Sequence, residues 1–162
     1  MATSVKVAAS SDGQPLERLT VAPHFNTPRL LTENDCGWML DLGKRRYSNQ
    51  FDFQATEQWY RNIVLKGPMM FWPMRTDNAF CIAMLSTTPW RPSTPECNIA
   101  LVVADENCMW EAIMLLRASI EWAKRRKCSL WRVSSETDFD LEPIARKLGA
   151  TEPHVRWVLR LE

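Results

Sequence analysis

The sequence predicts a single α/β domain, in which a mixed β-sheet carries helices on its faces. The chain has 162 residues, which suffices for one complete domain and is too short for two ordinary ones. Short apolar or alternating runs typical of strands are interspersed with longer amphipathic patterns typical of helices. The expected order of elements is β-α-α-β-β-β-α-β-α-β, without internal repeats.

The N-terminal part divides into an arm and the start of the domain. Residues 1–26 lack a sustained hydrophobic period, so we expect an N-terminal arm there and a single domain over 27–162. Arg29–Thr32 reads as a short strand. Glu33–Asp35 then supplies side chains that can cap a helix running through Leu42.

A second helix and a hairpin follow. The pattern predicts a helix over Ala55–Lys66, with Thr56 as its N-cap. Met70–Arg75 and Ala79–Ser86 read as two strands. The triplet Thr76-Asp77-Asn78 between them is typical of a tight turn, so the two strands are expected to pair antiparallel.

The central strand leads into the longest helix. Thr88–Pro95 holds three prolines and is expected to stay out of a central strand. The unbroken apolar run within Cys97–Val103 predicts a strand buried on both faces. Asp105 is expected to cap a helix that runs from Glu106. Its expected apolar stripe consists of Met109, Ile113, Leu116, Ile120 and Ala123.

The last third of the chain predicts a strand, a short helix and another strand. Ser129–Val133 is apolar and β-branched enough for a strand. Leu141–Leu148 reads as a helix that Gly149 ends. Val155–Leu161 alternates apolar and polar residues, as a half-buried strand does.

Charge and hydropathy exclude several classes of partner. The net charge of +1 gives no overall field for nucleic acid or a membrane surface. One basic run, Lys124–Lys127, falls at a helix end, where cations complement the helix dipole. It could instead contact phosphates, but a nucleic-acid partner is not expected. No apolar run approaches the ~20 residues that span a bilayer, so no membrane association is expected.

Cysteine and histidine usage favours a reducing compartment and no metal. The five cysteines form no C-x-x-C pair, and no signal peptide precedes them, so we expect a cytoplasmic or virion-associated protein. His24 and His154 lie far apart, so a metal site is not expected. Eight tryptophans and eight methionines make a surface for a protein partner plausible.

The element order resembles that of the GNAT superfamily of N-acetyltransferases. Two stretches carry the resemblance beyond the order: Arg29–Asp35, like that family's first strand and helix, and Ala145–Gly149, like its tyrosine-x-x-leucine-glycine ending. The resemblance extends from Arg29 to Leu161. It suggests a divergent member, of a kind found among bacteriophage products.

The resemblance implies an acetyl-CoA site between the central strand and the long helix. In that family the pyrophosphate lies on N–H groups at the helix N-terminus, and a β-bulge in the central strand frees backbone groups for the pantetheine arm. The glycine-containing phosphate motif falls on Asn107–Ala112, where only Ala112 fits and Trp110 replaces a glycine. Glu106 and Glu111 add negative charge there. The implied cofactor positions are Val102, Val103, Asn107, Cys108, Trp110 and Ala112.

The resemblance also implies a base and an acid for catalysis. Glu96, at the start of the central strand, could take the proton from an amine, although a carboxylate there could equally be a solvated edge residue. The position of the family's tyrosine is occupied by Ala145. Both tyrosines of the chain, Tyr47 and Tyr60, lie in its N-terminal half.

Two functions follow as hypotheses. The first is a non-catalytic binding or structural subunit of a larger assembly, such as a phage virion, with no cofactor. The second is an active but divergent N-acetyltransferase that uses acetyl-CoA, with Glu96 as base. The sequence leaves open whether the chain is an enzyme.

Overall fold

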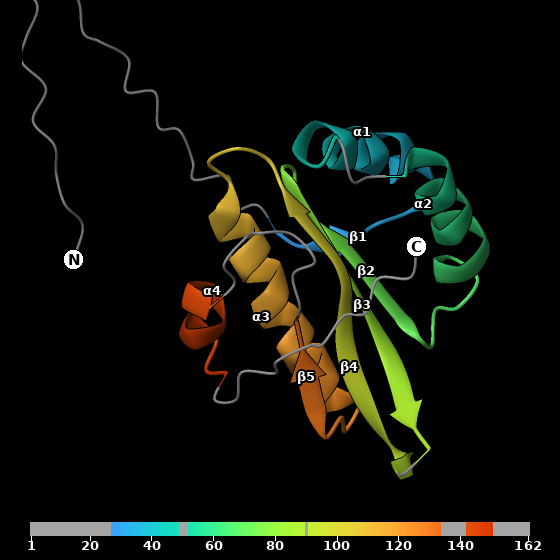
Figure 1. The fold of residues 1–162 in the computed structure, drawn as a ribbon, viewed down its shortest axis with the longest axis vertical. Helices are drawn as coiled ribbons and strands as arrows, with labels where there is room; N and C mark the ends of the chain where they lie inside the picture. The colour runs from blue at the N-terminus through green and yellow to red at the C-terminus, as the bar shows by residue number, and fades with distance from the viewer. Residues whose placement is uncertain (1–26, 49–51, 90, 134–141, 151–162) are drawn as a thin grey trace, which may run out of the picture.

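The computed structural model describes residues 27–48, 52–89, 91–133 and 142–150. In this part of the chain a five-stranded mixed sheet separates one helical layer, α1 and α2, from another, α3 and α4 (Figure 1). The predicted fold class is therefore confirmed. The expected arm, residues 1–26, and the expected strand Val155–Leu161 fall outside the described residues.

The strands follow one another across the sheet in chain order. Neighbours from β1 to β4 pair antiparallel, and β4 and β5 pair parallel. The hairpin expected around Thr76–Asn78 is present, since β2 pairs with β3 from Arg75↔Phe80 to Phe71↔Met84. The strands are β1 (Arg29–Leu30), β2 (Phe71–Arg75), β3 (Ala79–Thr88), β4 (Arg91–Ala104) and β5 (Leu130–Arg132).

The helices include one 3₁₀ turn and one π-helical turn. They are a 3₁₀ turn (Glu33–Asp35), α1 (Cys36–Arg46), α2 (Phe53–Trp59), a π-helical turn (Tyr60–Val64), α3 (Met109–Arg125) and α4 (Glu142–Lys147). Gly149 follows α4 with a φ of +83°, the left-handed conformation expected of a helix-ending glycine. In the part of the chain that the structure describes, no helix is long and apolar enough to cross a membrane.

Two helices begin at other residues than the sequence predicts. Asp52, not Thr56, caps α2, because its carboxylate accepts a hydrogen bond from the Ala55 N–H at 2.8 Å. The long helix begins at Met109 rather than Glu106. Asn107 has a φ of +62°, which no right-handed helix accommodates, so the chain makes a turn before α3.

The expectation that the proline-rich segment stays out of the sheet is wrong. β4 includes Pro92 and Pro95. The β3–β4 register is irregular between the pairs Ser86↔Glu96 and Thr88↔Arg91, and β5 joins β4 only from Glu96 onward. The prolines thus occupy a stretch where regular ladder hydrogen bonds are not required.

A hydrophobic core fills each face of the sheet. On one face, α1 and the π-helical turn cover Phe80 and Ile82 of β3. On the other, α3 packs on Cys81 and Ala83. The predicted apolar stripe of α3 is rotated by about one residue, because Met109 is 38% exposed while Leu115 is fully buried. The buried face of α3 comprises Glu111, Ala112, Leu115, Leu116, Ser119, Trp122 and Ala123.

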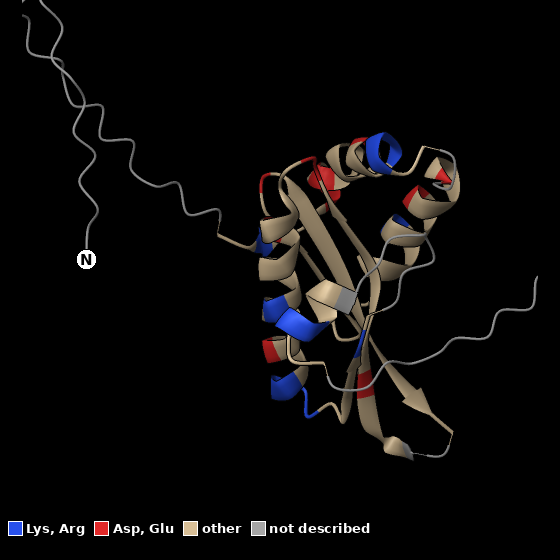
Figure 2. Cartoon of the chain, turned by 60° about the vertical axis from the view of Figure 1, so that its left-hand side comes forward, with Lys and Arg blue, Asp and Glu red and all other residues tan. Residues whose placement is uncertain are grey.

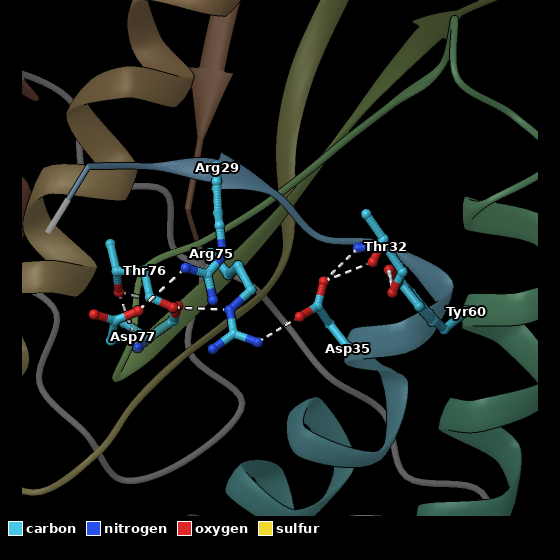
Figure 3. Close-up of polar contacts among 8 residues, drawn as sticks. Arg29, Thr32, Asp35, Tyr60, Arg75, Thr76 and Asp77 are labelled. Atoms are coloured by element: carbon cyan, nitrogen blue, oxygen red, sulfur yellow. Dashed lines mark hydrogen bonds and ion pairs between the residues drawn. The ribbon is translucent and has the colours of Figure 1, made fainter.

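A buried polar network fastens the start of α1 to the sheet (Figure 3). The Arg75 guanidinium donates to Asp35 Oδ1 at 2.6 Å and to the Thr76 carbonyl at 2.9 Å. The second Asp35 oxygen accepts from the Thr32 N–H at 2.9 Å and from its hydroxyl at 2.8 Å. The Tyr60 hydroxyl donates to the Thr32 carbonyl at 3.1 Å, so the network joins four elements.

Because of this network, the free energy of unfolding is expected to depend on pH in the acid range. Burial raises the pKa of the Asp35 carboxyl, but the hydrogen bonds from Thr32 and the Arg75 guanidinium outweigh it and hold the pKa below its ordinary value. The stabilisation is fully present above about pH 4 and is lost as pH falls through the lower folded-state pKa. Urea unfolding between pH 5 and 2 should show this loss, and an Asp35→Asn variant should show a smaller pH dependence. An equal slope in both proteins would contradict the assignment.

Candidate functional site

β4 extends beyond the end of β5 where the resemblance places an acyl-carrier site. β5 pairs with β4 from Glu96↔Leu130 to Asn98↔Arg132, whereas β4 continues to Ala104 (Figure 1). A β-bulge falls at Ala100, because Ala83 lies opposite Ile99 while the preceding Ile82 lies opposite Leu101. The bulge that the resemblance implies is therefore present, and β4 continues beyond its paired stretch with β5.

The bulge also changes the burial of the strand. Ala100 is exposed and Leu101 and Val102 are half-buried, so the expected burial on both faces is wrong for this stretch. Val103 is buried in the core beneath α1 and cannot contact a ligand without disrupting it. Of the two strand positions implied as cofactor contacts, Val102 is the accessible one.

Asp105 accepts hydrogen bonds from two backbone donors of the loop between β4 and α3 and links the loop to Asn78. The Asp105 carboxylate accepts a hydrogen bond from the Glu106 N–H at 3.0 Å. The Asp105 carbonyl accepts from the Cys108 N–H at 3.1 Å, and the Asp105 N–H donates to the Asn78 carbonyl at 2.8 Å. Asp105 thus closes a turn and does not cap α3, whose N-cap residue, Cys108, makes no side-chain cap hydrogen bond.

Two arginines from α1 compensate the carboxylates of this loop. Arg45 lies 3.1 Å from Asp105 Oδ2, and Arg46 lies 3.2 Å from Glu106 Oε1. Both pairs are solvent-exposed, so each adds little stability. Each of the two loop carboxylates is nevertheless paired with one arginine of α1.

The remaining positions of the phosphate motif differ in environment. Trp110 is 54% exposed, so its indole is not packed into the core. Ala112 lies on the buried face of α3, which packs on the sheet. Glu111 is 1% exposed. Its carboxylate accepts one hydrogen bond from the Asn78 backbone N–H at 3.1 Å and one from the Asn78 side-chain amide at 2.8 Å. Its charge therefore fixes the β2–β3 turn and is not presented to solvent.

The loop between β4 and α3 differs in its contacts from a helix N-terminus that is free to bind a pyrophosphate. The Glu106 N–H already donates to a carboxylate, and the Asp105 and Glu106 side chains place two negative charges at the helix start. Burial first, then the carboxylates of Glu111 and Asp105, raises the pKa of the Cys108 thiol. Carboxylates paired with Arg45 and Arg46 therefore lie beside the start of α3, where a phosphate would need positive potential.

Glu96, the candidate base, is held in a buried ion pair. The residue is 5% exposed, and its Oε2 lies 2.9 Å from Arg132 Nη1 on β5. The interpretation of Glu96 as a solvated edge residue is therefore wrong. Next to the pair, the Asn98 amide donates to the Ser86 hydroxyl at 2.7 Å. Sequence reasoning missed Arg132, because its place opposite Asn98 depends on the parallel register of β5.

The structure offers no activated nucleophile or acid among its thiols and its buried tyrosine. Burial is the largest cause that raises the pKa of the five cysteine thiols, that of Cys97 to about 12. Burial also raises the pKa of Tyr60 well above its ordinary value. Ala145, at the family's tyrosine position, lies on α4. Within the described ranges no cluster of histidine, cysteine and acidic side chains could hold a metal ion.

Several solved structures with this fold are described as acetyltransferases. No sequence family and no curated protein sequence matches the chain. A protein of Agrobacterium tumefaciens described as an acetyltransferase superposes with a TM-score of 0.68 at 15% identity, over 83% of this chain and 99% of that one. An aminoglycoside 6′-N-acetyltransferase in complex with a bisubstrate analogue gives 0.64 at 14%, over 84% and 97%. An enzyme of the same type from Acinetobacter haemolyticus gives 0.61 at 17%, over 84% and 99%. At these identities the likeness establishes the fold.

Proposed function

We propose that this chain is a binding protein on the N-acetyltransferase fold, a non-catalytic subunit of a larger assembly that does not use acetyl-CoA. The observation that carries the proposal is the loop between β4 and α3. Its Glu106 N–H is occupied by the Asp105 carboxylate, and its charges are matched by Arg45 and Arg46. A cofactor phosphate would have to displace these contacts and approach carboxylates.

The candidate catalytic groups support the same proposal. A base must be free to accept a proton from the substrate amine, but the Glu96 carboxylate is 5% exposed and is engaged by Arg132 at 2.9 Å. Ala145 replaces the tyrosine that would return a proton to a thiolate. The two positions that the resemblance implies for proton transfer therefore offer neither a free base nor a phenol.

Exposed apolar side chains favour a protein as the partner. Ile63, Met69 and Met70 lie around the end of the π-helical turn and the start of β2, and they are 51%, 66% and 47% exposed. Methionine is enriched at protein interfaces. A phage virion is one such assembly, and this setting extends the proposal beyond the fold on the strength of the resemblance alone.

Titration calorimetry with acetyl-CoA tests the proposal. We expect no saturable heat up to about 1 mM cofactor, which corresponds to binding weaker than about −4 kcal/mol. A variant with Asp105→Asn and Glu106→Gln removes both loop charges and should bind at least about tenfold more tightly than the parent. Micromolar binding by the unaltered protein would overturn the proposal.

The second candidate function, an active divergent N-acetyltransferase, is favoured by the β-bulge at Ala100 and by the continuation of β4 past the end of β5. Both features would let the exposed backbone near Ala100 hold an acyl carbonyl. In that case Glu96→Gln should abolish release of the CoA thiol in the presence of an amine. Glu121→Gln, an exposed control outside the loop, should leave the rate unchanged. An unchanged rate in Glu96→Gln would exclude Glu96 as the base.

A further inference from the structure

One side of the molecule is strongly basic although the chain as a whole is nearly neutral. The outer surface of α3 and the adjoining end of α4 present Arg117, Lys124, Arg125, Lys127 and Lys147, all exposed, which we call the basic face. Figure 2 shows these elements as blue segments along α3 and on the neighbouring α4. The net charge of the whole chain is only +1, whereas this face groups five exposed cations.

Helical geometry places the α3 members of the basic face together. Lys124 and Arg125 follow Arg117 by seven and eight residues, about two helical turns, so the three residues share one side of the helix. Lys127 continues past the helix end with a φ of +57°. The packing of Ile144 against α3 then brings Lys147 beside this row. Sequence alone placed only the run from Lys124 to Lys127 at a helix end.

Little negative charge offsets this row. Among the described residues, the outward stripe of α3 carries one carboxylate, Glu121, and its Oε1 lies 2.7 Å from the Lys124 ammonium. Both side chains of this pair are more than half exposed, so the pair is weak and easily exchanged. The basic face therefore keeps a net positive charge under ordinary salt conditions.

We propose that the basic face binds the phosphate backbone of a nucleic acid without reading its sequence. Rows of lysine and arginine that release condensed counterions are the usual electrostatic footprint of such binding. Protein interfaces are depleted in lysine and enriched in aromatic residues. None of the large apolar side chains that are exposed in the described ranges lies on α3 beyond Trp110 or on α4, which disfavours a protein and an inserted membrane surface here.

The inference does not depend on the proposed function, because the basic face and the loop between β4 and α3 share no residue. A protein could use acetyl-CoA and still bind phosphates here, or do neither. The result of acetyl-CoA calorimetry therefore tests only the proposed function, and the result of the nucleic-acid binding experiment tests only this inference.

Binding of the full chain to a fluorescein-labelled 20-base-pair DNA duplex of mixed sequence tests the inference. With about four phosphate contacts, the logarithm of the binding constant should fall against that of salt with a slope of about −3.6. The affinity should then drop about 100-fold between 50 and 200 mM KCl. A second duplex of unrelated sequence should bind equally.

A matched pair of variants locates the site. Lys124→Glu with Arg125→Glu should weaken binding at 50 mM KCl by at least about tenfold and make the slope less negative by about two units. Lys44→Glu with Lys66→Glu changes the net charge equally, at exposed positions outside the basic face, and should leave binding unchanged. Circular dichroism would verify that both variants are folded.

Three outcomes would overturn the inference. The first is no binding of the duplex at 50 mM KCl. The second is equal weakening in both variants, which would indicate a general charge effect. The third is binding to vesicles containing phosphatidylserine but not to the duplex, which would assign the basic face to a membrane surface.

Discussion

Replacing Arg75 by alanine is expected to lower the free energy of unfolding by about 3–5 kcal/mol, the usual cost of leaving one member of a buried ion pair uncompensated. The Arg75 side chain is 7% exposed and that of Asp35 is 19% exposed, so water cannot take the place of the guanidinium. The variant also loses the stacking of the guanidinium on Trp38, whose ring centroid lies 3.5 Å away. Equilibrium urea unfolding measures the difference.

The exposed pair between Arg29 and Asp77 provides the control for Arg75. These side chains are 56% and 60% exposed, so Arg29→Ala should change stability by less than about 1 kcal/mol. A double variant, Asp35→Asn with Arg75→Met, removes both charges and should recover part of the loss. Equal effects of Arg75→Ala and Arg29→Ala would show that the buried network does not fasten α1 to the sheet.

Glu111→Ala is expected to destabilise the fold by about 3 kcal/mol. The carboxylate is 1% exposed and accepts two hydrogen bonds from Asn78, whose donors would be left without this acceptor in the interior. Unpaired buried donors cost about 1–3 kcal/mol each, and hydrogen bonds to charged groups are the stronger kind. The variant should also loosen the turn between β2 and β3, which hydrogen exchange at Asn78 and Ala79 would detect.

Glu106→Ala is the matched control for Glu111→Ala, because both carboxylates belong to the same loop and helix start. Glu106 has a side chain that is 78% exposed and one ion pair, with Arg46. Its removal should cost well under 1 kcal/mol. If Glu111→Ala were as mild as Glu106→Ala, the buried carboxylate would not hold the turn.

The sequence predicts the fold well because hydrophobic period and turn chemistry are local. The hairpin at Thr76–Asn78 and the helix end at Gly149 follow from the turn residues themselves. The start of α3 does not, because a local hydrogen bond from the Glu106 N–H to Asp105 competes with the cap that the same residue could provide. The inclusion of Pro92 and Pro95 in β4 depends on where β5 begins to pair with it, which is set by tertiary structure.

The candidate site is less predictable than the fold. The absence of glycine from the loop and the replacement of a glycine by Trp110 can be read from the chain. The pairing of Glu96 with Arg132 and of Asp105 with Arg45 cannot, because each joins residues 36 or more positions apart through the arrangement of strands and helices. The same holds for the basic face, which needs α4 packed on α3.

The central claim is that the start of α3 is closed to a cofactor phosphate, and an NMR titration tests it most directly. The backbone amides of Glu106, Asn107 and Trp110 would be followed in ¹⁵N-labelled protein as coenzyme A is added to about 1 mM. The account predicts no saturable change in their chemical shifts, because the Glu106 N–H already donates to Asp105 and the surrounding carboxylates repel phosphate. Saturable shifts of these amides at micromolar coenzyme A would contradict it.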